Sequence, residues 1–296
     1  MNHWKAADAA MQNTCVAFGS FDGVHLGHRA IVAEMLRHSG ATPVVVSFET
    51  PDQPVLYSED EKAVLLEELG VDTLVSYPAA EAQAMEPAAF VKDVLVKKLG
   101  AKVIVVGKGF VFGKDGAGDV ALLQQLAGEC GYELTVCEPV LSAGEVVSAG
   151  AIFAAFEAKD FARATELFGH TYMMLGVVVH GKAEGRKVGM PTANLGIPDN
   201  KQYPPHGVYA TISTLDGEKR RGLTNIGLRP SADTMPHATV ETFLLNFKGD
   251  LYGKPMRLDV HLYVRGVIKF ANLEAVKEQV NKDIEHGHEY LAQIGL

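Results

Sequence analysis

The chain has 296 residues, 47% of them hydrophobic, and a formal net charge of −9. This size predicts two domains with buried cores, since domains usually hold about 100–200 residues. The acidic balance argues against a protein that binds nucleic acid through phosphate contacts. No apolar run approaches the roughly 20 residues that span a bilayer, and the first residues lack the apolar segment of a signal peptide. The three cysteines form no CxxC pair, so we expect no disulfide framework, no zinc site and a cytoplasmic location.

The first half of the chain alternates strand-like runs with amphipathic, helix-like segments. Residues 43–48 (PVVVSF) are typical of a parallel strand that is covered on both faces. Strands that alternate with helices predict right-handed βαβ units and an open parallel sheet. The predicted strands are 14–21, 43–48, 71–77, 101–107 and 132–140, and the predicted helices are 29–40, 59–70, 87–100 and 119–131.

Helical periodicity disappears from Tyr172 onward, and apolar residues alternate with polar ones instead. Asp216-Gly217 separates two alternating runs and predicts a hairpin turn. A succession of short antiparallel strands predicts a small closed barrel, and residues 270–295 predict an amphipathic helix on one side of it. The fold class is therefore α/β plus all-β, with a helical connector at 156–169.

Two histidines lie at the predicted junction between the first strand and the first helix. Residues 17–28 (AFGSFDGVHLGH) place His25 and His28 three positions apart. Ligands of open α/β sheets bind at the carboxyl ends of the strands, and the first turn of a helix offers free N–H groups to anions. A lone histidine would favour a capping or core role, but the FDGxHxGH combination favours a nucleotide site.

A glycine-rich segment with two basic residues opens the second half. Residues 180–195 (HGKAEGRKVGMPTANL) combine backbone freedom with groups that suit phosphate oxygens. In an extended segment Thr192 and Asn194 face the same side, where their oxygens suit a hard cation that also binds nucleotide phosphates. The composition alone favours a plainer interpretation, which is a polar hairpin loop followed by the start of a strand.

The FGSFDGVHLGH motif resembles the HxGH nucleotidyltransferases, and the chain is similar to the bacterial bifunctional riboflavin kinase/FAD synthetase family over nearly its whole length. This resemblance implies a Rossmann-like nucleotidyltransferase domain (1–155) that adenylylates FMN, a helical connector (156–170), and a six-stranded antiparallel barrel with a C-terminal helix (171–296) that phosphorylates riboflavin. It also implies a nucleotidyltransferase site that comprises Gly19, Phe21, Asp22, His25, Gly27 and His28.

The first half departs from the family pattern at several positions. The family's Ser-Ser-Thr-x-Ile-Arg corresponds to residues 148–153, where Phe153 replaces the phosphate-binding arginine. Its Phe-Glu-Pro-His-Pro and Asp-Phe-Arg-Phe-Gly become residues 48–52 (FETPD) and 109–113 (GFVFG), and its Asn before Phe-Asp-Gly becomes Ser20. One lost charge-assisted phosphate contact removes roughly 1.5–3 kcal/mol. We therefore expect a domain that folds but has weak or no FMN adenylyltransferase activity.

The second half keeps the kinase pattern. Residues 185–195 match the family's Gly-Arg-x-x-Gly-Phe-Pro-Thr-Ala-Asn-Leu with Met190 in place of Phe. The resemblance implies that Thr192 and Asn194 hold the Mg²⁺ of ATP and that the segment before them covers the nucleotide phosphates. The phosphate-binding residues implied in this way are Gly181, Gly185, Arg186, Gly189 and Pro191.

Phosphorylation of a hydroxyl needs a base within hydrogen-bond reach of the attacking oxygen. Alternation alone leaves Glu241, in the run ATVETFLL, equally open to a catalytic role and a solvent-facing one. The resemblance identifies it with the family's catalytic glutamate and associates Arg265 with the flavin side of the site; a surface charge is the alternative for Arg265.

The sequence therefore predicts a riboflavin kinase that uses Mg²⁺ and ATP and converts riboflavin to FMN. Its partners are small-molecule substrates, with no nucleic acid and no membrane, and no oligomeric state is indicated. One alternative is a fully bifunctional enzyme that continues to FAD. Others are a non-catalytic regulator that binds flavin or nucleotide, and an HxGH transferase with a different acceptor.

Overall fold

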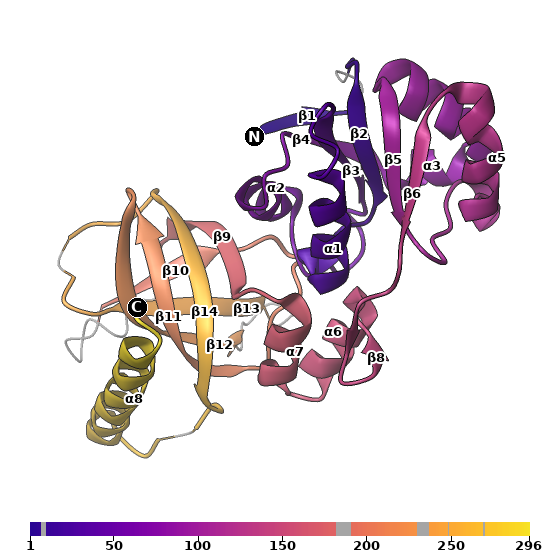
Figure 1. Cartoon of the computed structure of the whole chain (residues 1–296). Helices are drawn as coiled ribbons and strands as arrows, with labels where there is room; N and C mark the ends of the chain where they lie inside the picture. Colours follow the sequence, from indigo (N-terminus) through magenta and orange to yellow (C-terminus); the bar gives the residue numbers. More distant parts are fainter. Residues whose placement is uncertain (7–9, 182–190, 230–236, 248, 269) are drawn as a thin grey trace. The chain divides into compact units, whose positions relative to one another are not determined.

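The computed structural model describes residues 1–6, 10–181, 191–229, 237–247, 249–268 and 270–296. Its backbone contacts divide the chain into two compact units (Figure 1). The first unit holds Met1–Ile152 and Leu167–Gly169, and the second holds Phe153–Glu166 and His170–Leu296.

The first unit is built on a 6-stranded sheet with the order β1-β4-β3-β2-β5-β6, and all its strand pairs are parallel. The predicted open parallel sheet is confirmed, with one edge strand that was not predicted, β1, which pairs with β4. The strands are β1 (Asn2–Lys5), β2 (Thr14–Gly19), β3 (Thr42–Glu49), β4 (Thr73–Pro78), β5 (Ala101–Gly107) and β6 (Glu133–Cys137), followed by a small hairpin of β7 (Leu141–Ser142) and β8 (Glu145–Val146).

Helices connect these strands and have clear local end signals. A capping box begins α2, where the Ser58 N–H donates to Glu61 Oε2 at 2.8 Å. Gly131, with φ 71°, ends α5. The helical segments are η1 (Asp22–Val24), α1 (Leu26–Met35), α2 (Glu59–Glu68), α3 (Ala79–Ala84), α4 (Pro87–Ala89), η2 (Phe90–Lys98), η3 (Lys114–Gly116), α5 (Val120–Cys130), α6 (Ala149–Glu157) and α7 (Phe161–Phe168).

Two predicted helices differ in detail. The predicted helix 87–100 begins as α4 and continues as η2, which is a π-helix. In it the Leu99 N–H donates to Val94 O at 3.0 Å. The segment predicted as a helical connector, 156–169, comprises the end of α6 and all of α7, and Lys159, with φ 60°, separates the two helices. Asp160 restarts the second helix by accepting a 2.9 Å hydrogen bond from the Arg163 N–H.

The second unit contains a closed antiparallel barrel with the order β10-β13-β12-β11-β14-β9, as predicted. The Asp216-Gly217 turn joins β11 to β12, with φ 50° and 80° at its two residues, and both positive values suit the right-handed twist of a hairpin. The strands are β9 (Tyr172–Val179), β10 (Thr192–Gly196), β11 (Gly207–Leu215), β12 (Glu218–Arg229), β13 (His237–Leu244) and β14 (Pro255–Arg265).

Alternation gives the barrel wall two distinct faces. Inside it, the fully buried hydroxyls of Thr211, Thr224 and Thr242 form a chain with 2.9 Å links. On the outer face Ala210 and Ile212 pack against Leu291 of the C-terminal helix α8 (Leu273–Gln293), which runs beside the barrel in Figure 1. The predicted covering helix is confirmed, and it covers only part of the outer face.

Candidate functional site

The FDGVHLGH motif forms a tight loop, and the carboxylate of Asp22 joins this loop to the segment before α2. Phe21 and Val24 have φ 48° and 42°, a left-handed conformation that is uncommon for such residues. Asp22, which is buried, accepts hydrogen bonds of 3.0 Å from the N–H groups of Leu56 and Tyr57. The geometry therefore gives Asp22 an anchoring role, because its two oxygens hold the segment that precedes α2.

The two predicted histidines come together at the start of α1. Nδ1 of His25 caps the helix by accepting from the N–H groups of Gly27 and His28, at 3.1 and 3.4 Å. The imidazoles stack with centroids 3.7 Å apart, and His28 also stacks on Phe21 at 4.7 Å. Burial lowers the pKa of His28 well below the ordinary 6.5, and the charges of His25 and Lys62 lower it further. His28 is consequently neutral near pH 7.

A cavity of about 320 Å³ opens in front of these histidines. Its walls come from the carboxyl ends of β2 and β5, the neighbouring strands from which the chain proceeds in opposite directions across the sheet. Open α/β sheets bind their ligands at such a switch point. Gly19, Phe21, His25, Gly27 and His28 line this cavity, together with an apolar wall that includes Val105, Val106, Phe110, Val140 and Val146.

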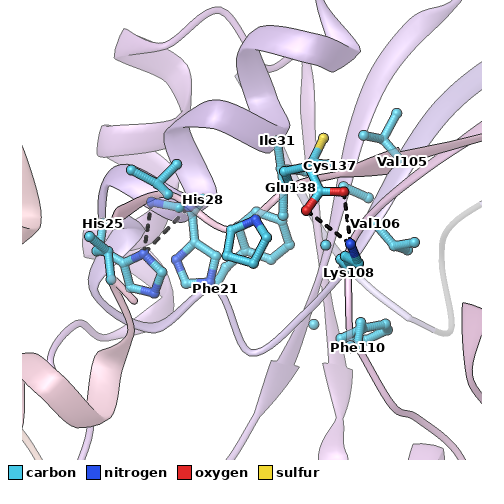
Figure 2. Close-up of a pocket in the computed structure, with 18 of the residues that line it drawn as sticks. Phe21, His25, His28, Ile31, Val105, Val106, Lys108, Phe110, Cys137 and Glu138 are labelled. Carbon is cyan, nitrogen blue, oxygen red and sulfur yellow. Dashed lines mark hydrogen bonds and ion pairs between the residues drawn. The ribbon is translucent and has the colours of Figure 1, made fainter. Parts of the chain in front are cut away.

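Lys108, which was not predicted from the sequence, supplies the positive charge of this cavity. It is the only lysine or arginine among the described lining residues. Its Nζ lies 3.0 and 3.2 Å from the carboxylate oxygens of Glu138, as the dashed lines in Figure 2 show. The available signal was its place directly after β5, at a carboxyl strand end.

A second lysine that was not predicted, Lys62, contacts the loop that contains Ser20. Lys62, on α2, is 2% exposed, and its ammonium group is fully hydrogen-bonded. Nζ donates to the Ser20 carbonyl at 2.8 Å, to Ser47 Oγ at 3.1 Å and to Glu59 Oε1 at 2.7 Å. Its spacing from Leu65 and Leu66 marked it as a charge on the apolar face of a helix.

The positions that depart from the family pattern hold no phosphate-binding charge. Val111 is 59% exposed, and Phe153 lies half-buried in α6. Ser148 Oγ accepts a 3.2 Å hydrogen bond from the Ala151 N–H, so this hydroxyl caps the start of α6.

The barrel brings the predicted kinase residues together on its outer face. In the strand register Glu241 of β13 lies directly opposite Asn194 of β10 on one side and Asn225 of β12 on the other. Thr192 lies two residues before Asn194 and opposite Phe243. Residues that are directly opposite, and residues two apart on a strand, share a face of the sheet. These side chains therefore form one polar patch.

This patch adjoins two cavities that share Thr192. The larger, of about 310 Å³, contains Asn225 and Glu241, and its apolar walls come from β11, β12, β13, the segment after β14, and Val276 and Val280 of α8. The smaller, of about 140 Å³, is lined by Pro191, Thr192 and the connection between β13 and β14, including Asp250 and Tyr252. The shared threonine therefore places its hydroxyl oxygen between the two cavities.

Arg265 lines the larger cavity in an ion pair with α8. Its Nε lies 3.0 and 2.9 Å from the two carboxylate oxygens of Asp283, and its Nη2 lies 2.7 Å from Oδ2. Gln279 donates to the same carboxylate at 2.9 Å. The guanidinium also lies 5.7 Å from the ring centroid of Phe270. Arg265 thus fixes α8 to the barrel as well as bordering the cavity.

The glycine-rich segment is described only at its ends. Gly181 packs against the Asn194 amide so closely that a Cβ would overlap it. Gly185, Arg186 and Gly189, the other residues predicted to contact phosphates, lie outside the described residues.

The donor set fits a hard cation that also binds phosphates. Thr192 and Asn194 offer a hydroxyl and an amide oxygen on one face, and Mg²⁺ accepts few protein ligands when nucleotide phosphates complete its shell. The described residues contain no group of three or more His, Cys, Asp or Glu side chains that could hold a metal alone. Among those residues, no helix combines the length and the apolar character that crossing a membrane requires.

Comparisons with known proteins cover both units. A family model described as riboflavin kinase matches residues 168–291, and one described as FAD synthetase matches residues 7–151. Curated relatives called bifunctional riboflavin kinase/FMN adenylyltransferase include a Pseudomonas fluorescens protein, 34% identical over 91% of both chains. A second is from Escherichia coli K12, 35% identical over 93% of this chain and 92% of that protein.

A solved structure described as a macrolide-efflux protein from Streptococcus pneumoniae has a similar fold, with a TM-score of 0.83 and 25% identity over 97% of this chain and 99% of that one. The family matches agree with the two observed units: a parallel sheet with an HxGH loop, and a closed antiparallel barrel. The protein is an enzyme with a riboflavin kinase domain. By its matches along nearly the whole chain, it belongs to the family of bifunctional riboflavin kinase/FMN adenylyltransferases.

Proposed function

We propose that the barrel unit transfers the γ-phosphate of ATP to the 5′-hydroxyl of riboflavin, with Glu241 as the base. The hydroxyl oxygen attacks the γ-phosphorus, the bond to the β,γ-bridging oxygen breaks, ADP leaves, and the proton passes to the Glu241 carboxylate. The observation that carries the proposal is the cross-strand row of Asn194, Glu241 and Asn225 beside Thr192.

The two cavities suit the two substrates. The larger cavity has mainly apolar walls and contains Glu241, so we assign the flavin ring and its ribityl chain to it. The smaller cavity adjoins Pro191 and the glycine-rich segment, so we assign ATP to it. Thr192 and Asn194 would hold Mg²⁺ between them; when bound, the ion supplies positive charge that neutralises the phosphate oxygens.

The transfer is tested by incubating the full chain with riboflavin, Mg²⁺ and ATP labelled in the γ-phosphate. We expect label in FMN and none in a parallel reaction with 5′-deoxyriboflavin, which lacks the attacking oxygen. Label in the deoxy compound, or absence of labelled FMN, would refute the assignment.

For the first unit, we propose that FMN adenylyltransferase activity is weak or lost. The support is the charge around the cavity: its described cation, Lys108, is paired with Glu138, and valine and phenylalanine replace family arginines at 111 and 153. Each missing contact lowers the rate by roughly ten- to a hundredfold if it acts in the transition state.

The alternative, a fully bifunctional enzyme, is favoured by the names of the curated relatives. Supplying FMN as the sole acceptor with Mg²⁺ and ATP separates the two. We expect FAD to form at least a hundredfold more slowly than FMN forms from riboflavin, a gap of the size that two lost contacts produce. Comparable rates would establish the bifunctional enzyme.

The remaining assignments are also proposals. We propose domains at 1–155 and 171–296 with a connector at 156–170, supported by the family matches to 7–151 and 168–291. A cytoplasmic location is supported by free thiols at all three cysteines.

A further inference from the structure

Asn225 lines the larger cavity, to which the flavin is assigned, but neither the sequence motifs nor the assigned chemistry give it a role. It is exposed, although both of its neighbours along β12, Thr224 and Ile226, are fully buried. Its side chain therefore points away from the barrel interior and lines the larger cavity together with Glu241.

The register fixes its distance from the base. Asn225 and Glu241 are direct cross-strand partners, and the Cβ atoms of such partners lie about 4.5–5.5 Å apart. Val208 of β11 is the partner of Asn225 on its other side, and Val208 is also paired with Arg265. Asn225 is thus positioned between the base and the apolar wall that would hold the flavin ring.

The other polar groups of the cavity are already engaged. Arg265 and Asp283 bind each other, and Thr192 is assigned to the metal and the nucleotide. Among the described residues, no side-chain hydrogen bond involves the Asn225 amide. An amide both donates and accepts hydrogen bonds, which matches the secondary hydroxyls of a sugar alcohol chain.

We propose that Asn225 is a specificity-determining residue that binds a secondary hydroxyl of the ribityl chain and so aligns the terminal 5′-hydroxyl with Glu241. This inference rests on the proposed kinase function and deepens it. It predicts that the enzyme distinguishes a polyhydroxylated chain from a simple alkyl alcohol of the same length.

The test compares riboflavin with a flavin that carries a 5-hydroxypentyl chain, which keeps the terminal hydroxyl and lacks the three secondary ones. In the wild-type enzyme we expect kcat/KM to favour riboflavin. Asn225→Ala should raise the KM for riboflavin about tenfold, as expected for one lost hydrogen bond, and should leave the hydroxypentyl flavin nearly unaffected. The discrimination between the two acceptors should therefore shrink about tenfold.

Asn281→Ala removes another exposed amide, on α8, that does not line the cavity, and should change neither acceptor. Asn225→Ser, which keeps a shorter donor and acceptor, should restore part of the discrimination. Equal losses for both acceptors in Asn225→Ala, or unchanged discrimination, would overturn the role of Asn225. A wild-type chain that forms no FMN would instead refute the proposed function itself.

Discussion

Glu241 has a structural setting that its own position on the chain does not reveal. A carboxylate in an apolar, alternating strand is costly unless it is solvated or paired. Its side chain is half-buried between two asparagines contributed by different strands. The carboxylate therefore lies among polar side chains and is accessible to the hydroxyl of an acceptor substrate.

Glu241→Gln keeps the shape of the side chain and removes the base. We expect kcat for FMN formation to fall by about 10²–10⁴-fold, the usual contribution of general base catalysis, with little change in the KM for riboflavin. Steady-state kinetics measure both values. Glu218→Gln, at the exposed start of β12, is the matched control and should behave as wild type; kinase activity retained in Glu241→Gln would show that another group is the base.

His28 gives the first unit a predictable pH dependence. Its pKa is lowered from 6.5 by burial, so the unfolded chain binds a proton near pH 6.5 that the folded chain does not yet bind. The free energy of unfolding therefore decreases as the pH falls below about 6.5. Urea unfolding at a series of pH values should show a weaker slope in this window for His28→Gln; an identical slope would contradict the buried neutral histidine.

Single residues were only partly predictable. The motif residues His25, Thr192 and Asn194 stand out because their spacing suggests a ligand site, whereas Glu241 stands out only through the family resemblance. Asn225 does not stand out, because its position beside Glu241 depends on the pairing of β12 with β13. Local spacing places Lys62 on the apolar face of α2, but it does not reveal the hydrogen-bond partners Ser20 and Ser47. These are long-range facts that local spacing does not contain.

At the scale of elements, the ion pair between Arg265 and Asp283 joins α8 to the barrel near the cavity. The Asp283 side chain is 3% exposed and that of Arg265 is 16% exposed. Removing one partner from such a pair leaves a buried charge without compensation, which costs about 3–5 kcal/mol. Val276 and Val280 of the same helix border the flavin cavity, so stability and substrate binding should be coupled.

Asp283→Ala should consequently lower the free energy of unfolding by about 3 kcal/mol or more and raise the KM for riboflavin, because the cavity wall loosens. Chemical denaturation and kinetics measure the two effects. Lys282→Ala breaks the neighbouring exposed pair with Glu278 and should leave both quantities within error. A stable Asp283→Ala variant with normal KM would show that α8 is held by its apolar face alone.

Elements with strong periodicity were predicted well, and those set by local strain were not. The β-branched run of β3 and the amphipathic α8 carry enough signal in their own residues. The break at Lys159 depends on one left-handed residue and the Asp160 cap. Edge strand β1 forms because β4 offers an open parallel edge. The residues Asn2–Lys5 alone do not predict this pairing.

The whole molecule combines two ligand-binding architectures on one chain. The change from helical to alternating periodicity predicts both of them, because α/β sheets and closed barrels have different apolar periods. Loss of charge within the first does not disturb its fold: the apolar core of β2–β5 is buried without the arginines that the family pattern contains. The nucleotidyltransferase fold is therefore compatible with the replacements at 111 and 153.

We propose that the chain phosphorylates riboflavin and stops largely at FMN. Chromatography of the products formed over time from riboflavin, Mg²⁺ and excess ATP separates this outcome from continued conversion to FAD. We predict that FMN accumulates in proportion to the ADP released, with FAD appearing only as a slow, minor product. FAD formation that keeps pace with FMN would contradict the claim for the first unit, and failure to form FMN would contradict it for the barrel.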